Sequence, residues 1–302
     1  MMPTLTKRCQ HTLLLAKYNR ICYILRVTVS LLRGSHREDR VNRIDFVEKL
    51  MERGQYHFTL DDVMKAFENS EDAARAVVRR LKQSGRVATP HSGFFVIVPP
   101  QYRRIGCLPP QEFIPQLMNH LGEAYYISLL SAAMFHGASH QKPQIYQVML
   151  RENRRSIECG RVRVDFIARH DIGRVPTQSF NTARGEATVS TPEATAVDLV
   201  GYPNHSGGLN NVATVLTELS EKLRPDKLAE IGPKIAPTAW LQRLGYLLDF
   251  VGAEESSKSL AAYISDRDPR VTPLSPSHDG MKGMPRDERW RLAVNYDVEP
   301  DL

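Results

Sequence analysis

The sequence of 302 residues lacks the marks of a disulfide-rich, zinc-binding or membrane-spanning protein. Its four cysteines, Cys9, Cys22, Cys107 and Cys159, are widely separated and form no CxxC pair, which disfavours a zinc site or a disulfide framework. The best candidate for a membrane span, residues 13–32, is interrupted by three basic residues, whereas a span needs about 20 mainly apolar residues. These absences fit a reducing compartment, and we expect a cytoplasmic protein with no membrane partner.

Signatures of common enzymes are missing as well. The sequence has no HExxH motif, no GxxxxGK[ST] loop and no GxSxG elbow. Asp165, Glu186 and Glu193 invite comparison with a metal-dependent nuclease, which places carboxylates and a lysine on neighbouring strands. The lysine is absent here, because Lys142 is the only one between residues 83 and 221. We therefore expect no enzymatic activity and no cofactor, and a metal-dependent nucleic-acid enzyme is kept as the alternative.

Two other sets of side chains could carry chemistry but have simpler interpretations. His136 and His140 lie four residues apart and could bind a metal, yet no third ligand is evident, so a polar helix end is the simpler interpretation. Asp198 stands among Val197, Leu199 and Val200, which favours a carboxylate on a helix face or at the edge of the core over a general base. No metal site is predicted.

Excess positive charge is confined to one end of the chain. Residues 1–40 hold eight of the 40 Lys and Arg residues but only two of the 34 acidic residues, so the remainder is neutral despite the net charge of +6. Helical patterning becomes consistent only from residue 42 onward. We interpret 1–40 as a basic extension, either a disordered tail or a translated upstream region. Only local clustering of charge can therefore argue for a nucleic-acid partner.

The stretch from 70 to 98 carries the strongest local signal. Ser70 can cap a helix, negative charge follows in the first turn, and Gly85 can end it. An apolar stripe occupies one side and basic residues gather on the other. Two strand-prone segments, 86–88 and 94–98, follow across the turn-rich connector 89–93. The expected DNA-binding residues of this stretch are Ser70, Arg75, Arg79, Arg80, Lys82 and His91.

The elements before this helix complete a winged-helix order. Apolar spacing predicts helices over 44–51 and 60–67, with a short strand at 56–58 between them. We therefore predict an α+β protein with a winged helix-turn-helix domain at 41–104, followed by a mixed α/β domain at 105–302. Arg75 and Arg79 would face the major groove, while Arg80, Lys82 and His91 would meet phosphates. An ordinary amphipathic surface helix with a hairpin is the alternative.

The second domain is expected to mix strands and helices. Helices are predicted at 112–121 and 123–135, strands at 145–150, 160–168 and 185–190, and mainly helices from 192 to 263. An exposed loop at 266–285 and a returning strand at 290–296 would end the chain. Basic residues around the first strands form a possible second surface for nucleic acid or an acidic protein: Arg151, Arg154, Arg155, Arg161 and Arg163.

Several strings after residue 40 resemble the AbiEi family of antitoxins, which belong to two-gene type IV toxin–antitoxin and phage-defence modules. They occur in the family's order and cover most of the chain after residue 40. Family members usually begin near the equivalent of Val41, in line with an N-terminal extension. The strings are GFFVIVPPQYR (93–103), YYISLLSAA (125–133), HGASHQ (136–141), STPEATAVDLV (190–200), QRLGYLL (242–248) and RWRLAVN (289–295).

The resemblance implies an antitoxin without catalytic activity of its own. Its winged helix would bind operator DNA, with inverted repeats as one form of operator, and repress its own promoter. Its C-terminal domain would neutralise a cognate nucleotidyltransferase-like toxin, either by contact or by opposing the toxin's effect on its target. A plain transcription factor with a ligand-sensing C-terminal domain is a further alternative.

Overall fold

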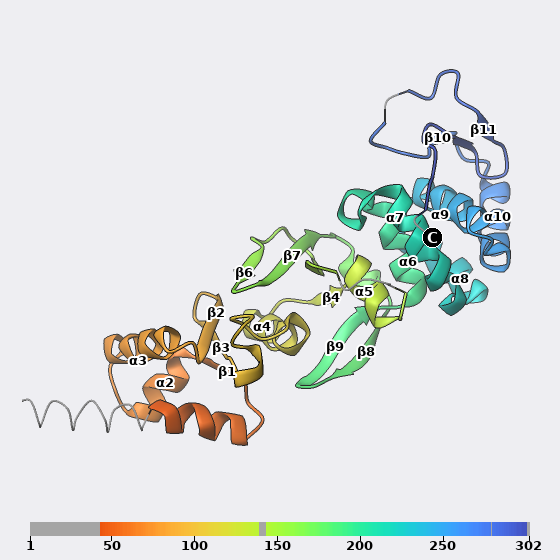
Figure 1. Ribbon diagram of the computed structural model, residues 1–302. Helices are drawn as coiled ribbons and strands as arrows, with labels where there is room; N and C mark the ends of the chain where they lie inside the picture. The colour runs from red at the N-terminus through yellow and green to blue at the C-terminus, as the bar shows by residue number, and fades with distance from the viewer. Residues whose placement is uncertain (1–42, 139–142, 279, 301–302) are drawn as a thin grey trace, which may run out of the picture. The chain divides into compact units, whose positions relative to one another are not determined.

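The computed structural model describes residues 43–138, 143–278 and 280–300 (Figure 1). The predicted extension at 1–40 lies outside the described residues. The chain forms two compact units, and each is described by itself. Within the described part, the first comprises 43–55 and 61–83, and the second comprises 56–60 and everything from 84 onward. No helix of the described residues is long and apolar enough to cross a membrane.

The first unit is helical. A helix over residues 43–52 is followed by α2 (Leu60–Phe67) and α3 (Glu71–Gln83), as the apolar spacing predicts. Gly54, at φ 71°, takes the left-handed conformation that ends the first helix. The rings of Phe46 and Phe67 lie 5.4 Å apart. Buried apolar side chains from all three helices form the interior: Val47, Leu50, Val63, Ala74, Val78 and Leu81.

A three-stranded antiparallel sheet belongs to the second unit. Its order is β1 (His57–Thr59), β3 (Phe94–Ile97) and β2 (Val87–His91). The connector expected over 89–93 is shorter than predicted, because β2 continues through Pro90 to His91 and leaves only a turn at Ser92 and Gly93. The register shifts between Ala88 and His91. Such an irregularity is where a strand tolerates proline, which cannot donate to the ladder.

A six-stranded mixed sheet forms the centre of the second unit. The strands are β4 (Tyr125–Ile127), β5 (Tyr146–Leu150), β6 (Ile157–Cys159), β7 (Val162–Ala168), β8 (Thr177–Thr182) and β9 (Gly185–Ser190), in the order β6-β7-β5-β4-β9-β8. β5 runs parallel to β7, and β4 runs parallel to β9. The other neighbouring pairs are antiparallel.

Alternation along these strands divides the buried side chains between two apolar clusters. Val148 and Val164 join a cluster with α4 (Ile114–Leu121) and the hairpin residues Phe94 and Val96. Met149 and Ile167 join the cluster formed with the C-terminal helices. Because successive side chains point to opposite faces of a sheet, the two clusters lie on its two faces.

The prediction of one helix over 123–135 is wrong. Residues Tyr125–Ile127 form β4, and the helix α5 spans only Leu129–Phe135. The strand is held by pairing with β5 on one side and β9 on the other. Leu129, at φ 50°, marks the abrupt change from strand to helix. Neighbours distant in the sequence therefore override the local helical pattern.

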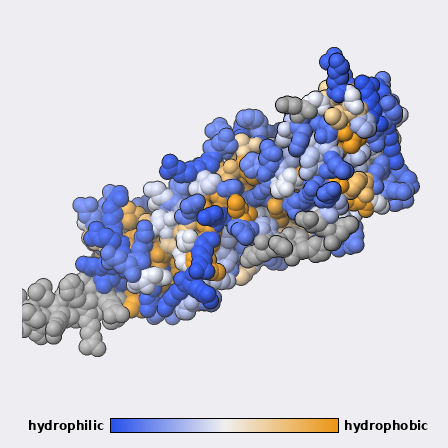
Figure 2. Space-filling model, turned by 45° about the horizontal axis from the view of Figure 1, so that its top comes forward, coloured by the Kyte–Doolittle hydropathy of each residue, from blue (hydrophilic) through white to orange (hydrophobic). Residues whose placement is uncertain are grey.

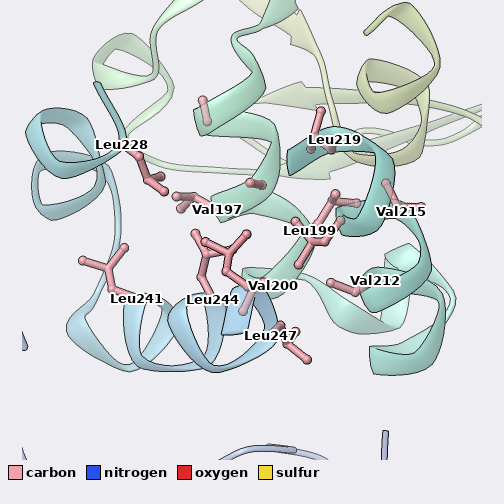
Figure 3. Close-up of a cluster of buried hydrophobic side chains, with 14 of the residues drawn as sticks. Val197, Leu199, Val200, Val212, Val215, Leu219, Leu228, Leu241, Leu244 and Leu247 are labelled. Carbon is pink, nitrogen blue, oxygen red and sulfur yellow. The ribbon is translucent and has the colours of Figure 1, made fainter. Parts of the chain in front are cut away.

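Helices make up most of the remaining chain. Thr191 accepts a hydrogen bond from the Ala194 amide at 3.4 Å, and α6 follows with Pro192 at its first position, as predicted. α6 packs against α5, α7, α8 and α9, and Figure 3 shows its apolar side chains among those of α7, α8 and α9. The bounds are α6 (Pro192–Gly201), α7 (Gly208–Leu219), α8 (Pro225–Ile235), α9 (Thr238–Phe250) and α10 (Glu254–Arg267).

The C-terminal segment returns to this helical layer. Instead of the strand expected over 290–296, only β12 (Leu292–Ala293) forms, between β10 (Thr272–Pro273) and β11 (Arg286–Asp287). Trp290 is fully buried and donates from Nε1 to Asp249 at 2.7 Å. Gly245 lets the ring pack against α9, because a Cβ there would lie 2.0 Å from it.

The face drawn in Figure 2 is mainly hydrophilic, with apolar atoms in separate patches.

Candidate nucleic-acid interface

Helix α3 presents basic side chains opposite its buried stripe. Ser70 begins the helix, and its hydroxyl accepts a hydrogen bond from the Ala73 amide at 3.4 Å. Ala74, Val78 and Leu81 are buried, which fixes the orientation of the helix within the first unit. Arg75, Arg79, Arg80 and Lys82 are all exposed.

The four basic residues of α3 do not form one stripe. Arg75, Arg79 and Lys82 follow at intervals of four and three, so they lie side by side along one flank. Arg80 lies about 100° further round the helix, on the other flank. Glu71 forms an ion pair with Arg75, and both side chains are more than half exposed. The flank therefore offers three cations, one of which shares its charge with a carboxylate of the first turn.

His91 follows α3 in the sequence, in the hairpin β2–β3, and belongs to the second unit. The hairpin β2–β3 carries no Lys or Arg from Val87 to Val98, and His91 is its single basic candidate. The His91 Nε2 lies 3.5 Å from the Arg154 guanidinium, and its Nδ1 lies 2.9 Å from the Ser92 carbonyl oxygen. The structure thus brings together one residue of the expected DNA-binding set and one of the second basic set.

The second basic set is spread along the sheet. Leu150 pairs with Ala168, whereas Tyr146 pairs with Val164, so Arg151 follows one end of β5 while Arg163 lies near the start of β7. Four residues of strand separate these ends, or roughly 13 Å. Arg154 forms an ion pair with Glu123. Arg155 is exposed in the connection before β6, and Arg161 is exposed in the turn before β7.

The carboxylates of the alternative enzyme hypothesis are not assembled. Asp165 is on β7 and Glu186 on β9, and β5 and β4 lie between these strands. Three strand spacings amount to roughly 14 Å. Glu193 is buried, and its carboxylate accepts a hydrogen bond from the Arg224 backbone amide at 3.1 Å. Across the described parts of the chain, no three His, Cys, Asp or Glu side chains could hold a metal together.

Of the two histidines considered as metal ligands, only His136 lies within the described residues. His140 lies outside the described residues. His136 caps α5, is buried, and its Nε2 lies 2.8 Å from the Ser190 carbonyl oxygen. Burial lowers the pKa of His136. His136 is thus a hydrogen-bonded core residue at a helix end, as the simpler interpretation had it.

A buried polar cluster around Asp198 is the main feature that the sequence did not predict. Asp198 is fully buried, not at the edge of the core, and forms an ion pair with Arg169. The Tyr126 hydroxyl donates to Asp198 at 2.9 Å. Arg169 also donates to Asp171 at 2.9 Å and to the Ile235 carbonyl oxygen. These partners come from four separate segments, which only the fold brings together.

Electrostatics agree with an ionised cluster at neutral pH. Full burial raises the pKa of Asp198 to about 6, although Arg169 and the Tyr126 hydroxyl oppose that rise. Burial alone would lower the pKa of Arg169, but the attraction of Asp198 raises it above its usual value. Burial and Asp198 together raise the pKa of Tyr126, so its hydroxyl keeps its proton. The cluster therefore links β4, the segment that follows β7, α6 and α8 through charge-assisted hydrogen bonds.

Comparison with known proteins places the second unit. Residues 126–250 match the AbiEi antitoxin C-terminal domain. No curated protein matches the sequence. The chain is similar to the crystal structure of the RV2827C protein from Mycobacterium tuberculosis, with a TM-score of 0.60 and 19% identity, over 82% of this chain and 88% of that chain. At this identity the likeness shows a shared fold alone.

A second solved structure, an antigenic nucleotidyltransferase-like protein from Paracoccidioides brasiliensis, aligns with 52% of this chain and 87% of its own. Its TM-score of 0.31 and identity of 10% are too low to support any argument. The assignment rests on the domain match, which includes the sheet strands β4 to β9 and the helices α6 to α9. Through the domain formed by residues 126–250, the match supports an AbiEi-family antitoxin.

Proposed function

We propose that this chain is the antitoxin of a two-gene toxin–antitoxin module for phage defence and that it represses its own promoter. The match of residues 126–250 to the antitoxin domain carries the first part of this proposal. The second part is supported by the basic flank of α3 in a chain whose remaining charge is balanced. Both parts need experiments of their own, because they rest on different residues.

The DNA-binding part assigns α3 as the recognition helix of a winged helix. The helices over 43–52, α2 and α3 precede the hairpin β2–β3 in the order typical of that fold. A recognition helix enters the major groove, where arginine bonds guanine in bidentate fashion. We assign this contact to Arg75 and Arg79. Arg80, Lys82 and His91 would bind phosphates and set the position of the protein on the duplex.

The antitoxin part assigns neutralisation to the second unit. The expected partner is a nucleotidyltransferase-like toxin encoded beside this gene. The second unit would neutralise it either by binding the toxin or by opposing the toxin's effect on its target. Exposed arginines at 151, 155, 161 and 163 offer two separated cationic areas for an acidic protein or a nucleic acid. Because Phe94 and Val96 of the hairpin belong to the apolar cluster of this unit, full-length variants are better suited to the test than a chain cut after residue 100.

Operator binding is tested by gel-shift titration with the promoter fragment. The triple variant Arg75→Ala, Arg79→Ala, Lys82→Ala is compared with a control of equal charge, Lys227→Ala, Lys234→Ala, Lys258→Ala, whose lysines are exposed on α8 and α10. We expect the first to lose most of its affinity and to show a weaker salt dependence, since each phosphate contact contributes about 0.9 to the slope of log affinity against log salt. An equal loss of operator affinity in both triple variants would show that net charge alone causes the effect.

Neutralisation is tested by co-expression with the neighbouring gene and measurement of growth. We expect the α3 triple variant to restore growth like the unaltered chain when both are supplied from an unregulated promoter, because the antitoxin domain is intact. Failure of the unaltered chain to restore growth would contradict the antitoxin proposal. A further variant, Arg161→Ala with Arg163→Ala, tests the basic strand: unchanged DNA binding and unchanged neutralisation would remove that surface from both roles.

A further inference from the structure

A hollow beside the start of β7 has the features of a small-molecule site. It is a cavity of about 250 Å³ whose wall is mostly apolar and includes Pro109, Pro110, Met134 and Val162. A second, more open hollow adjoins it, and the two share Gln144, Arg161 and Arg163. Ligand sites in proteins are typically apolar cavities with a few convergent polar groups. A mostly apolar wall that also contains two exposed arginines fits that description.

The two arginines are free to bind an anion. Both are exposed, and neither forms an ion pair with any residue that the structure describes. Two arginines elsewhere in the second unit are instead held by carboxylates: Arg154 by Glu123, and Arg184 by Glu112. A guanidinium presents a planar fork of donors that matches phosphate or carboxylate.

The wall of the cavity is fixed by a close approach of two backbone segments. Gly160, at φ 60°, lies so near the 105–106 loop that a Cβ there would be 2.2 Å from the Ile105 carbonyl oxygen. The Arg161 amide donates to that same oxygen at 2.8 Å. Pro109 and Pro110 continue the loop with restricted backbone angles. The turn that carries Arg161 is therefore held against the loop that lines the cavity, which lowers the ordering cost of binding.

We propose that this cavity binds a small organic anion, with its apolar body inside and its phosphate or carboxylate on Arg161 and Arg163. The site uses none of the residues of the α3 flank, and it adds the apolar cavity to an arginine pair that the antitoxin proposal uses only as a cationic surface. A nucleic-acid backbone would use the arginines alone, whereas this ligand uses the apolar interior as well. Binding by the purified protein can therefore succeed or fail whatever the outcome for operator DNA or toxin.

The test uses the purified full-length protein and four probes: phenyl phosphate, phenylacetate, inorganic phosphate and phenol. Dissociation constants come from ligand-observed NMR titration. We expect phenyl phosphate or phenylacetate to bind at least tenfold more tightly than both inorganic phosphate and phenol, and the stronger of the two identifies the anionic group. Equal binding of inorganic phosphate and either aryl anion would overturn the proposal, because the cavity would then contribute nothing.

Two variants locate the binding. The double variant Arg161→Ala with Arg163→Ala should raise the dissociation constant of the aryl anion at least tenfold. The control, Arg151→Ala with Arg155→Ala, should leave that dissociation constant unchanged. Met134→Trp, at a half-buried position on the wall, should block the aryl anion while leaving the weak binding of inorganic phosphate. Thermal unfolding checks that each variant is folded. Unchanged aryl binding in folded Met134→Trp, or equal weakening by both arginine pairs, would place the ligand elsewhere and refute the site.

Discussion

In the first compact unit the basic side chains of α3 lie in solvent, whereas in the second unit Arg169 is buried against Asp198 and Tyr126. The exposed side chains reach into solvent, where a partner can contact them, and the ion pair of Arg75 with Glu71 is itself more than half exposed. The buried cation has its hydrogen-bonding groups engaged by the protein itself. Substitutions in the two regions should therefore have different effects. Those on α3 should alter operator binding without changing the free energy of unfolding, and those around Asp198 should lower the free energy of unfolding.

The largest effect is expected at the buried cluster. Asp198→Ala leaves Arg169 buried without its main counter-charge, and breaking such a pair costs about 3–5 kcal/mol of unfolding free energy. Urea denaturation followed by circular dichroism measures it. The matched control is Asp171→Ala, whose side chain is 39% exposed, and which should cost no more than about 1 kcal/mol. Similar losses in the two variants would contradict the importance of burial.

A smaller loss of stability is expected from Gly245→Ala. The added Cβ would lie within 2.4 Å of three ring atoms of Trp290, which is fully buried. Overpacking of this kind costs about 1–3 kcal/mol. The control Gly173→Ala has no atom within 4 Å of its Cβ and should leave the thermal midpoint unchanged. A Gly245→Ala variant as stable as the control would show that the Trp290 ring can move.

On the exposed side of the comparison, Arg79→Ala should weaken operator binding by about 1–3 kcal/mol. Its unfolding free energy should stay within about 0.5 kcal/mol of the unaltered chain, as for other surface substitutions. The control Lys227→Ala removes a charge that is also exposed, from α8. Equal operator affinity of Arg79→Ala and the unaltered chain would exclude this flank as the reading surface.

The smallest expected effect concerns pH. The folded-state pKa of His136 is lowered by burial, so its contribution to stability is present above its unfolded pKa, near 6.5, and is lost as the pH falls below that value. Asp198, with its pKa raised to about 6, acts in the opposite direction, because the folded state takes up its proton first. His136→Gln should therefore lose less stability than the unaltered chain between pH 7 and pH 5. A larger loss would contradict the buried neutral form.

Local signals predicted those elements whose causes are local. Ser70, the apolar spacing of α3 and Gly85 lie within one stretch, and α6 begins at its predicted Thr-Pro start. The strand β4 was missed because its pairing partners lie in β5 and β9. The strand β8 was missed because an exposed polar segment shows no apolar alternation, and only its pairing with β9 makes it a strand.

The same distinction applies to the candidate sites. The basic flank of α3 follows from residue spacing alone, so the sequence predicts which three side chains share it. The sequence predicts Asp198 on a helix face or at the edge of the core, but its full burial depends on Arg169 and Tyr126, which lie 29 and 72 residues away. The spread of the second basic set along β5 and β7 depends on strand register, which the sequence does not reveal.

The hairpin β2–β3 has a consequence for how shortened forms of the protein would fare in the cell. Phe94 stacks with His57 of β1 and lies near His120 of α4, and Val96 and Val98 share their apolar cluster with Leu108 and Ile114. A product of internal translation initiation or of proteolysis after residue 100 would lack this cover and expose apolar surface, which favours aggregation. Such a fragment would be a substrate for chaperones and proteases.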